Sequence, residues 1–224
     1  MPGLVDRIRE VEARIRAACE ACGRNPDSVE LLPISKRQPP SLIREASLQG
    51  YSRFGENYVQ EGSAKAREFP DFAFVLTGPL QRNKARLALE SFQEIQSLDR
   101  PELATRLRHL AEELDLVRKV WIQVDLWGEA TKLGGCPREE LQALLEALGQ
   151  DPRLPLQGFM AIPPPGRPEA FAEVDALRRE WQESLGHPLR TSLGMSDDLE
   201  AAIASGSDQV RIGTAFFGSR PIPF

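Results

Sequence analysis

Lys36 is the residue of this sequence best placed for covalent chemistry. It comes directly after the apolar segment 30–35, which has the composition of a short β-strand. A lysine held where a strand leaves an apolar interior is partly desolvated, and this favours the neutral amine that attacks a carbonyl. The alternative is a solvated strand-end lysine that pairs with an acidic neighbour.

Two glycine-containing segments near the C-terminal end have the composition of a phosphate site. Gly194–Asp197 and Gly213-Thr214 each come after a predicted strand. Glycine lets the backbone approach a ligand closely, and Ser196 and Thr214 add hydroxyl groups. We expect Asp197 to cap the following helix, whose first amide groups would favour an anion. Either segment alone also fits a capped turn, but the two together predict a phosphate site.

Arg211 is a charged residue within a predicted strand, between Val210 and Ile212. Because side chains alternate along a strand, Arg211 points to the opposite face from its two neighbours. A charge inside a closed sheet needs a partner. We expect that partner to be a carboxylate such as Glu56, or an atom of a ligand.

The elements that must position these residues alternate between strand and helix. The predicted strands are 30–35, 52–55, 73–77, 94–97, 119–124, 156–160, 189–193 and 209–212. The predicted helices are 4–22, 39–50, 58–67, 83–91, 101–115, 138–148, 169–185 and 197–205. Strands separated by helices pair in parallel, and eight such units favour a closed (β/α)₈ TIM barrel over an open doubly wound sheet. We expect one domain over residues 1–224, with functional residues at the C-terminal ends of the strands.

Composition argues against several classes of function. The net charge of −5 disfavours a nucleic-acid partner. No apolar run approaches the roughly 18 residues of a membrane span. Residues 1–10 have the pattern of an amphipathic helix rather than a secretory signal. Without such a signal, the odd count of three cysteines favours a reducing compartment, the cytoplasm.

The C-x-x-C formed by Cys19 and Cys22 is predicted to be a pair of small buried thiols. Cys19 continues the apolar stripe of the first helix. Zinc would require further ligands, and the two histidines, His109 and His187, lie elsewhere in the sequence. We therefore expect no metal site.

A strand-end lysine, a phosphate cup and an interior arginine together resemble the pyridoxal 5'-phosphate (PLP) barrel of alanine-racemase type. More narrowly, the chain resembles the YggS/PROSC family of pyridoxal phosphate homeostasis proteins from about Leu31 to Gly218. Six motifs in order make the match specific: Ile34–Lys36, Phe54–Glu61, Gly78–Lys84, Gly128–Gly134, Leu193–Asp197 and Val210–Thr214.

The resemblance implies a set of cofactor-binding residues: Lys36, Asn57, Ser196, Arg211, Gly213 and Thr214. Lys36 would hold PLP as a Schiff base, Arg211 would hydrogen-bond the pyridine nitrogen, and Asn57 would lie near the cofactor face. The remaining three residues would hold the phosphate. The family is usually described as binding and buffering PLP, with no established catalytic turnover.

The leading hypothesis is thus a PLP carrier or buffer, a monomer or weak dimer, with apo forms of PLP-dependent enzymes as candidate recipients. An arginine at the ring nitrogen agrees with this, because arginine only donates and leaves the ring a poor electron sink. The alternative is a PLP-dependent enzyme such as a weak amino-acid racemase, for which we find no second acid/base group and no second domain. A cofactor-free Schiff-base aldolase would use Lys36 but leave Arg211 unexplained.

Three positions depart from the family pattern. Val75 and Gln96 stand where histidines are usual, and Asp125–Trp127 replaces an Asn-x-Ser. Lys132, in the long loop after the fifth strand, is a candidate second amine that receives the cofactor before release. Its alternative is a solvated loop lysine.

Overall fold

The computed structural model describes residues 3–128 and 134–219. Its eight strands are β1 (Glu30–Pro33), β2 (Arg53–Glu56), β3 (Ala73–Leu76), β4 (Glu94–Leu98), β5 (Lys119–Val124), β6 (Leu156–Ala161), β7 (Arg190–Ser192) and β8 (Gln209–Ile212). The helices are α1 (Leu4–Ala21), α2 (Pro40–Ser47), α3 (Val59–Glu68), α4 (Ala85–Ser91), α5 (Pro101–Leu114), α6 (Leu141–Leu148), α7 (Glu169–Leu185), α8 (Leu199–Ala204) and α9 (Thr214–Phe217). Short 3-10 turns lie at Pro26–Ser28, Arg82–Lys84 and Arg138–Glu140.

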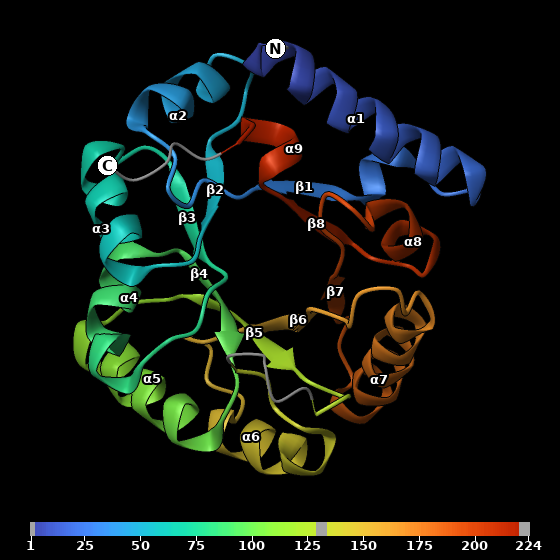
Figure 1. Ribbon diagram of the computed structural model, residues 1–224. Coiled ribbons are helices and arrows are strands. Elements are labelled where there is room, and N and C mark those ends of the chain that lie inside the picture. The colour runs from blue at the N-terminus through green and yellow to red at the C-terminus, as the bar shows by residue number, and fades with distance from the viewer. Residues whose placement is uncertain (1–2, 129–133, 220–224) are drawn as a thin grey trace.

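All eight strands are parallel and form one sheet in the order β1-β8-β7-β6-β5-β4-β3-β2. The sheet closes between its two end strands, where Ile34 forms a bridge with Gly55. The Ser35 N–H also donates to the Gly55 carbonyl at 2.8 Å. The predicted (β/α)₈ barrel is therefore confirmed. Seen along its axis, helices form an outer ring around the strands (Figure 1).

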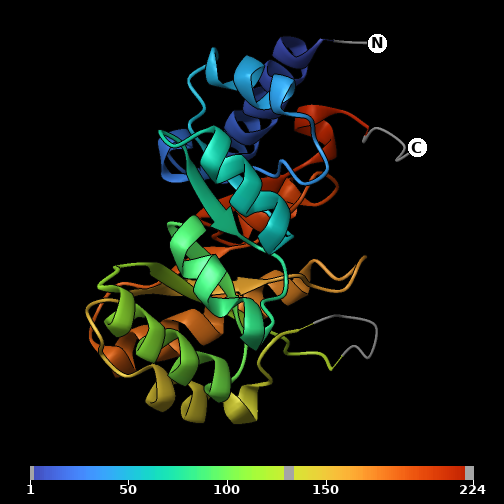
Figure 2. The ribbon, with the colours of Figure 1, turned by 90° about the vertical axis from the view of Figure 1, so that its left-hand side faces the viewer.

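Proline and apolar spacing account for the helices. Pro40 and Pro101 begin α2 and α5, where the missing N–H costs no hydrogen bond. Apolar side chains spaced three or four residues apart give each helix one face that packs against the barrel. In α1 this face includes Leu4, Ile8 and Val11, all of which are buried. Figure 2 shows α3, α4 and α5 following one another along the outside of the barrel. No helix in the described ranges is both long and apolar enough to cross a membrane.

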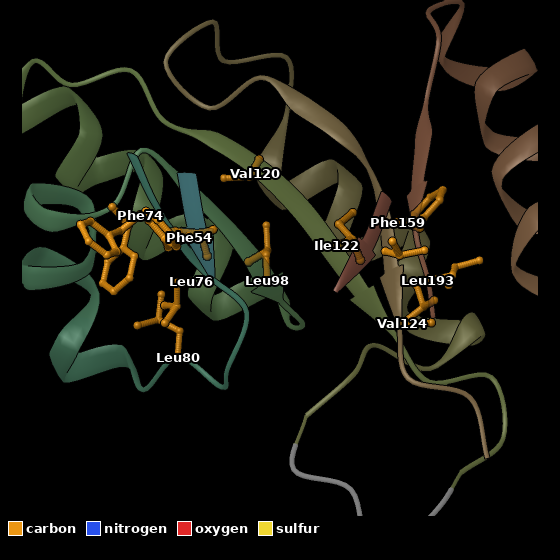
Figure 3. Packing of buried hydrophobic residues seen from close by; sticks show 14 of the residues in the cluster. Phe54, Phe74, Leu76, Leu80, Leu98, Val120, Ile122, Val124, Phe159 and Leu193 are labelled. Atoms are coloured by element: carbon orange, nitrogen blue, oxygen red, sulfur yellow. The ribbon is translucent and has the colours of Figure 1, made fainter. Parts of the chain in front are cut away.

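The main hydrophobic core lies between the strands and the ring of helices. Phe54 of β2 and Phe74 of β3 are register partners, and their ring centroids are 6.2 Å apart (Figure 3). Both are fully buried, and each contributes about 1.5–3 kcal/mol by leaving water. A second, smaller cluster contains Leu32, Ile34 and Val75. Val75 thus fills an apolar position at the place where the family pattern has a histidine.

The structure adds one helix that the sequence did not predict. The helix α9 follows β8 and has four residues, about one turn, so it contains too little sequence for a periodic pattern to show. It is held by tertiary packing instead, because Phe216 and Phe217 are buried. The helix packs against α1, and in the view along the barrel it lies near β1 and β8 (Figure 1).

The prediction of two buried thiols in the C-x-x-C is wrong for one of them. Cys19 is fully buried, but Cys22 is exposed. Cys22 caps α1, which ends at Ala21, so it falls outside the buried stripe.

We expect a thiol reagent to label only Cys22 of the folded protein rapidly. Cys19 and Cys136 are fully buried, and burial raises the pKa of both thiols, to about 12 for Cys136. Titration with a chromogenic disulfide, before and after denaturation, measures this. Rapid labelling of all three thiols in the native protein would contradict the packing described here.

Candidate cofactor site

A cavity of about 510 Å³ lies among the loops that follow the strands. This volume is within the range of small-molecule sites, roughly 300–1,000 Å³. The residues that line it come from α1 and from the ends of β1, β2, β3, β6, β7 and β8: Arg14, Ile34, Lys36, Asn57, Thr77, Ile162, Met195, Ser196, Asp197, Arg211, Gly213, Thr214 and Ala215. All six residues singled out from the sequence are among them. The barrel thus brings together six residues that are spread along the chain from position 36 to position 214.

Alternation along β1 explains how Lys36 reaches this cavity. Leu32 and Ile34 belong to the small apolar cluster with Val75, and Lys36 is the next residue of the same alternation. Ser35, on the opposite face, contacts the layer of helices through Glu56. Lys36 is half-buried and lines the cavity, so its amine lies at the mouth rather than in the packed core.

The loop after β7 is shaped by Gly194, whose φ of +91° is rare for other residues. A Cβ at this position would also come within 2.6 Å of the Ala202 Cβ. The loop presents Ser196, whose Oγ accepts a 3.3 Å hydrogen bond from the N–H of Ala215. This bond joins the β7 loop to the helix α9, which follows β8.

Asp197 does not cap the following helix, so that prediction is wrong. The helix α8 begins at Leu199 and its N-cap is Asp198. The Asp198 carboxylate turns back instead and accepts from the N–H of Met195 at 2.6 Å. Asp197 is exposed and lines the cavity.

Gly213 differs from Gly194 because the protein alone does not require a glycine there. Its φ of −103° is ordinary, and a Cβ would meet nothing closer than Ile34, at 3.7 Å. Gly213 and Thr214 both line the cavity. Space left by a missing side chain beside a hydroxyl group fits the close approach of a ligand oxygen to the backbone.

Arg211 is buried and lies on the inner face of β8. Its guanidinium donates to the Ser192 carbonyl, to the Ser192 Oγ at 2.9 Å and to the Ala161 carbonyl at 2.8 Å. Within the described part of the chain these partners are all neutral oxygens. Burial lowers the pKa of Arg211 to about 10, so the group remains a cation at neutral pH.

Glu56, the carboxylate that the sequence suggested for Arg211, is not its partner. Glu56 shares a face of β2 with Phe54, which packs in the outer core, and its side chain contacts Lys65 of α3. Arg211 lies on the inner face of the barrel, so the two side chains are on opposite sides of the sheet.

Asn57 is positioned by close contact between two loops. Its side-chain oxygen accepts from the Thr77 hydroxyl at 3.3 Å. Gly78 lies so close that a Cβ would come within 2.2 Å of the Asn57 carbonyl oxygen. Only glycine leaves room for this approach.

We expect Gly78→Ala to displace Asn57. Because the contact is with backbone, the added methyl group should lower the free energy of unfolding by about 1–3 kcal/mol and distort the cavity. Chemical denaturation measures the first effect, and ligand affinity the second. Gly3→Ala is a control, because its Cβ would meet only Asp6 Oδ2, at 3.6 Å; equal behaviour of the two variants would refute the close packing.

Comparison with known proteins decides the family. The model of the alanine racemase N-terminal domain matches residues 8–221. The pyridoxal phosphate homeostasis protein of Pseudomonas aeruginosa is 45% identical and covers 98% of this chain and 97% of its own. That of Escherichia coli is 41% identical, covering 98% of each. The chain belongs to the pyridoxal phosphate homeostasis family of alanine racemase N-terminal-like domains. The resemblance inferred from the six motifs is confirmed.

Solved structures extend the comparison. PipY of Synechococcus elongatus, solved with PLP bound, is 36% identical, with a TM-score of 0.80 over 92% of this chain and all of PipY. An alanine racemase of Clostridium difficile has a TM-score of 0.76 at 12% identity and covers 97% of this chain but 58% of its own. The second likeness concerns the fold alone.

Arg14 lines the cavity but was not predicted from the sequence. It comes from α1, which precedes the barrel, and it pairs with Glu200 of α8 at 2.8 Å. It also donates to the Ser196 carbonyl at 2.9 Å. Arg14 therefore fixes the β7 loop and adds a cation to the cavity lining. A polar residue on the exposed side of a helix gave no signal for this role. Thr77 was missed as well, although its place at the end of β3 could have indicated it.

The residues that depart from the family pattern do not line the cavity, but one of them is connected to it through hydrogen bonds. Gln96 donates to Gln209 and to Glu94, both at 2.7 Å, inside the barrel. Gln96 also accepts from Ser192, the residue that binds Arg211. Trp127 donates to Glu173 on α7 at 2.8 Å.

Lys132 lies outside the described residues, so its suggested role stays a prediction. Within residues 3–128 and 134–219, no group of three or more His, Cys, Asp or Glu side chains could hold a metal ion.

Proposed function

We propose that this protein binds PLP reversibly through Lys36 and acts as a carrier and buffer of the cofactor. The observation that supports this most is the convergence of an amine, hydroxyl groups and a buried guanidinium on one cavity. The names of the relatives and the PLP bound by PipY support the same ligand.

The ligand supplies an aldehyde, and Lys36 supplies the amine that condenses with it. One water leaves when the Schiff base forms, and water returns the free aldehyde when the bond is hydrolysed. The mouth of the barrel suits this exchange because Lys36 is half-buried. Reversible bonding is what a carrier requires.

The phosphate of PLP fits the loops after β7 and β8. The hydroxyls of Ser196 and Thr214 are available as donors, and Gly213 leaves space for an oxygen at the backbone. The Arg14 guanidinium adds positive charge next to the Ser196 carbonyl. These residues would orient the ligand so that its aldehyde faces Lys36.

Arg211 would donate to the pyridine nitrogen. Because it remains charged at neutral pH, it cannot accept a proton from the ring and only donates. The nitrogen is then held unprotonated, and the ring is a poor acceptor for the electrons of a carbanion. Binding is favoured over turnover.

A racemase would need a second acid/base group on the face of the ligand opposite Lys36. Among the described residues that line the cavity none is a tyrosine or histidine. Asp197 is the carboxylate there, but it is exposed and adjoins Ser196, on the proposed phosphate side. We infer that the protein stores and delivers PLP, with apo-enzymes in the cytoplasm as recipients.

We expect the purified protein to be yellow, to bind about one PLP per chain and to restore the activity of an apo-aminotransferase when mixed with it. With L- or D-alanine in heavy water, proton NMR should show at most slow, one-sided exchange of the α-proton. Racemic alanine formed at about 1 per second or faster would replace the carrier with the racemase. A colourless protein that cleaves an aldol substrate would instead point to an aldolase.

A further inference from the structure

A buried lysine lies on the outer side of the barrel wall that carries Lys36. Lys65 of α3 has a side chain that is 7% exposed, and its partner Glu56 is fully buried. The Lys65 Nζ donates to three oxygens: the Ser35 carbonyl at 2.6 Å, Glu56 Oε1 at 2.6 Å and Glu61 Oε1 at 2.8 Å. An ammonium has three N–H groups, so this number of acceptors uses all of them.

The same two carboxylates bind the residues on both sides of Lys36, one through a side chain and one through the main chain. Before it, the Ser35 Oγ donates to Glu56 Oε1 at 2.6 Å. After it, the N–H of Arg37 donates to Glu61 Oε1 at 2.5 Å. Lys65 joins the two carboxylates, so one connected set of hydrogen bonds holds the residues that flank Lys36.

The turn that this set holds is an unfavourable one for its residue. Arg37 has a φ of +57°, in the left-handed region that residues with a side chain rarely adopt. The Arg37 side chain is tied to Tyr58, whose hydroxyl accepts at 3.0 Å and whose ring lies 5.4 Å from the guanidinium. Such a conformation persists when surrounding contacts over-determine it.

The set of charges is poorly suited to stabilising the fold alone. Glu56 Oε2 is buried and has no hydrogen-bond partner in the described chain. Burial raises the pKa of Glu56 even though Lys65 opposes the shift. Buried ion pairs contribute little net stability because desolvation offsets their attraction. The contribution of these ion pairs is geometric, since they fix the direction of the chain around Lys36.

We propose that Lys65, with Glu56 and Glu61, is a positioning group for Lys36. It holds the end of β1 and the left-handed turn at Arg37, so that the Lys36 amine meets the ligand aldehyde. This inference rests on the proposed function, in which Lys36 is the anchor. Lys65 itself is not a second anchor, because its ammonium is fully engaged and lies on the outer side of the sheet.

The test separates attachment to Lys36 from occupancy of the rest of the site. The variant is Glu61→Ala, because Glu61 is partly exposed (26%) and its loss leaves the buried Lys65–Glu56 pair intact. Glu61→Gln keeps an oxygen for the Arg37 N–H and serves as the conservative rescue. Glu68→Ala is the matched control, because Glu68 lies on α3 like Glu61 but forms only a surface ion pair, with Arg44 of α2. Lys65→Arg is a second variant, since a planar fork cannot meet the same three acceptors.

Two ligands are compared on each folded variant. PLP has the aldehyde, and its attachment rate is followed by the growth of the visible band after mixing. Pyridoxine 5'-phosphate has an alcohol instead, so its affinity reports the phosphate and ring contacts alone. We expect Glu61→Ala and Lys65→Arg to slow attachment of PLP roughly tenfold to a hundredfold. Their affinity for pyridoxine 5'-phosphate should stay within about twofold, and Glu61→Gln should regain most of the rate.

Attachment at the wild-type rate in both variants would overturn the positioning role. An equal loss for both ligands would also overturn it, because that pattern belongs to a residue that supports the whole site. If the unaltered protein bound neither ligand, the proposed function itself would fail, and this outcome is recognised before any variant is made.

Discussion

Lys36→Ala is expected to abolish the visible absorption band of protein-bound PLP while the protein stays folded. Lys36 is half-buried in the turn after β1, so its removal leaves no cavity in the core. Without the amine no Schiff base forms at the mouth, and PLP is held only by the phosphate and ring contacts. Absorption spectra with PLP in slight excess measure the loss, and circular dichroism checks the fold.

A matched control is Lys119→Ala, because Lys119 is an exposed lysine at the start of β5, at the opposite end of the barrel. This variant should keep the full band. A Lys36→Ala protein that retained a borohydride-reducible cofactor at full occupancy would show that another lysine is the anchor.

Replacing either of the two proposed phosphate-binding hydroxyls, those of Ser196 and Thr214, is expected to weaken PLP binding strongly. A hydrogen bond to a charged group contributes about 1.5–3 kcal/mol, so Ser196→Ala and Thr214→Ala should each lower affinity roughly tenfold to a hundredfold. Thr214 is exposed and Ser196 half-buried, so neither change should unfold the protein. At high PLP concentration the visible band should still appear, because Lys36 is intact.

The affinity is measured by titration of the visible band, with inorganic phosphate as a competitor. Ser47→Ala is a suitable control, because its hydroxyl donates only to the Arg44 carbonyl on α2 in the described structure. Unchanged affinity in both hydroxyl variants would place the phosphate elsewhere. Competition by phosphate should be weaker in the variants than in the unaltered protein.

Much of the site could be predicted because barrel geometry is regular. Asn57 and Gly213 follow directly after β2 and β8, and Lys36 lies three residues after the end of β1. The ends of parallel strands meet at one edge, which brings these residues together. Alternation likewise placed Arg211 on the inner face. Strands β5 and β8 have the predicted bounds, since their apolar runs are bordered by polar or loop residues.

What could not be predicted depends on contacts between distant segments. Arg14 reaches the cavity only because α1 packs beside α8, and nothing local to residue 14 reports that packing. The partners of Arg211 are mainly backbone carbonyls of β6 and β7, which every residue has and no sequence pattern marks. The predicted N-cap of α8, Asp197, is wrong by one residue, because the N-cap is Asp198. Nothing in the sequence distinguishes the two adjacent aspartates as caps.

The proposed bond between Lys36 and PLP is the chemical basis of the carrier function. It is tested most directly by adding one equivalent of PLP, reducing with borohydride, digesting the protein and locating the pyridoxyl group by mass spectrometry. The chain has five lysines: Lys36, Lys65, Lys84, Lys119 and Lys132. We expect one adduct per chain, on the peptide that contains Lys36. A second adduct on Lys132 that appears only with excess PLP would support Lys132 as a second amine that receives the cofactor before release. An adduct at one equivalent on any other lysine, with Lys36 unmodified, would show that Lys36 is not the anchor.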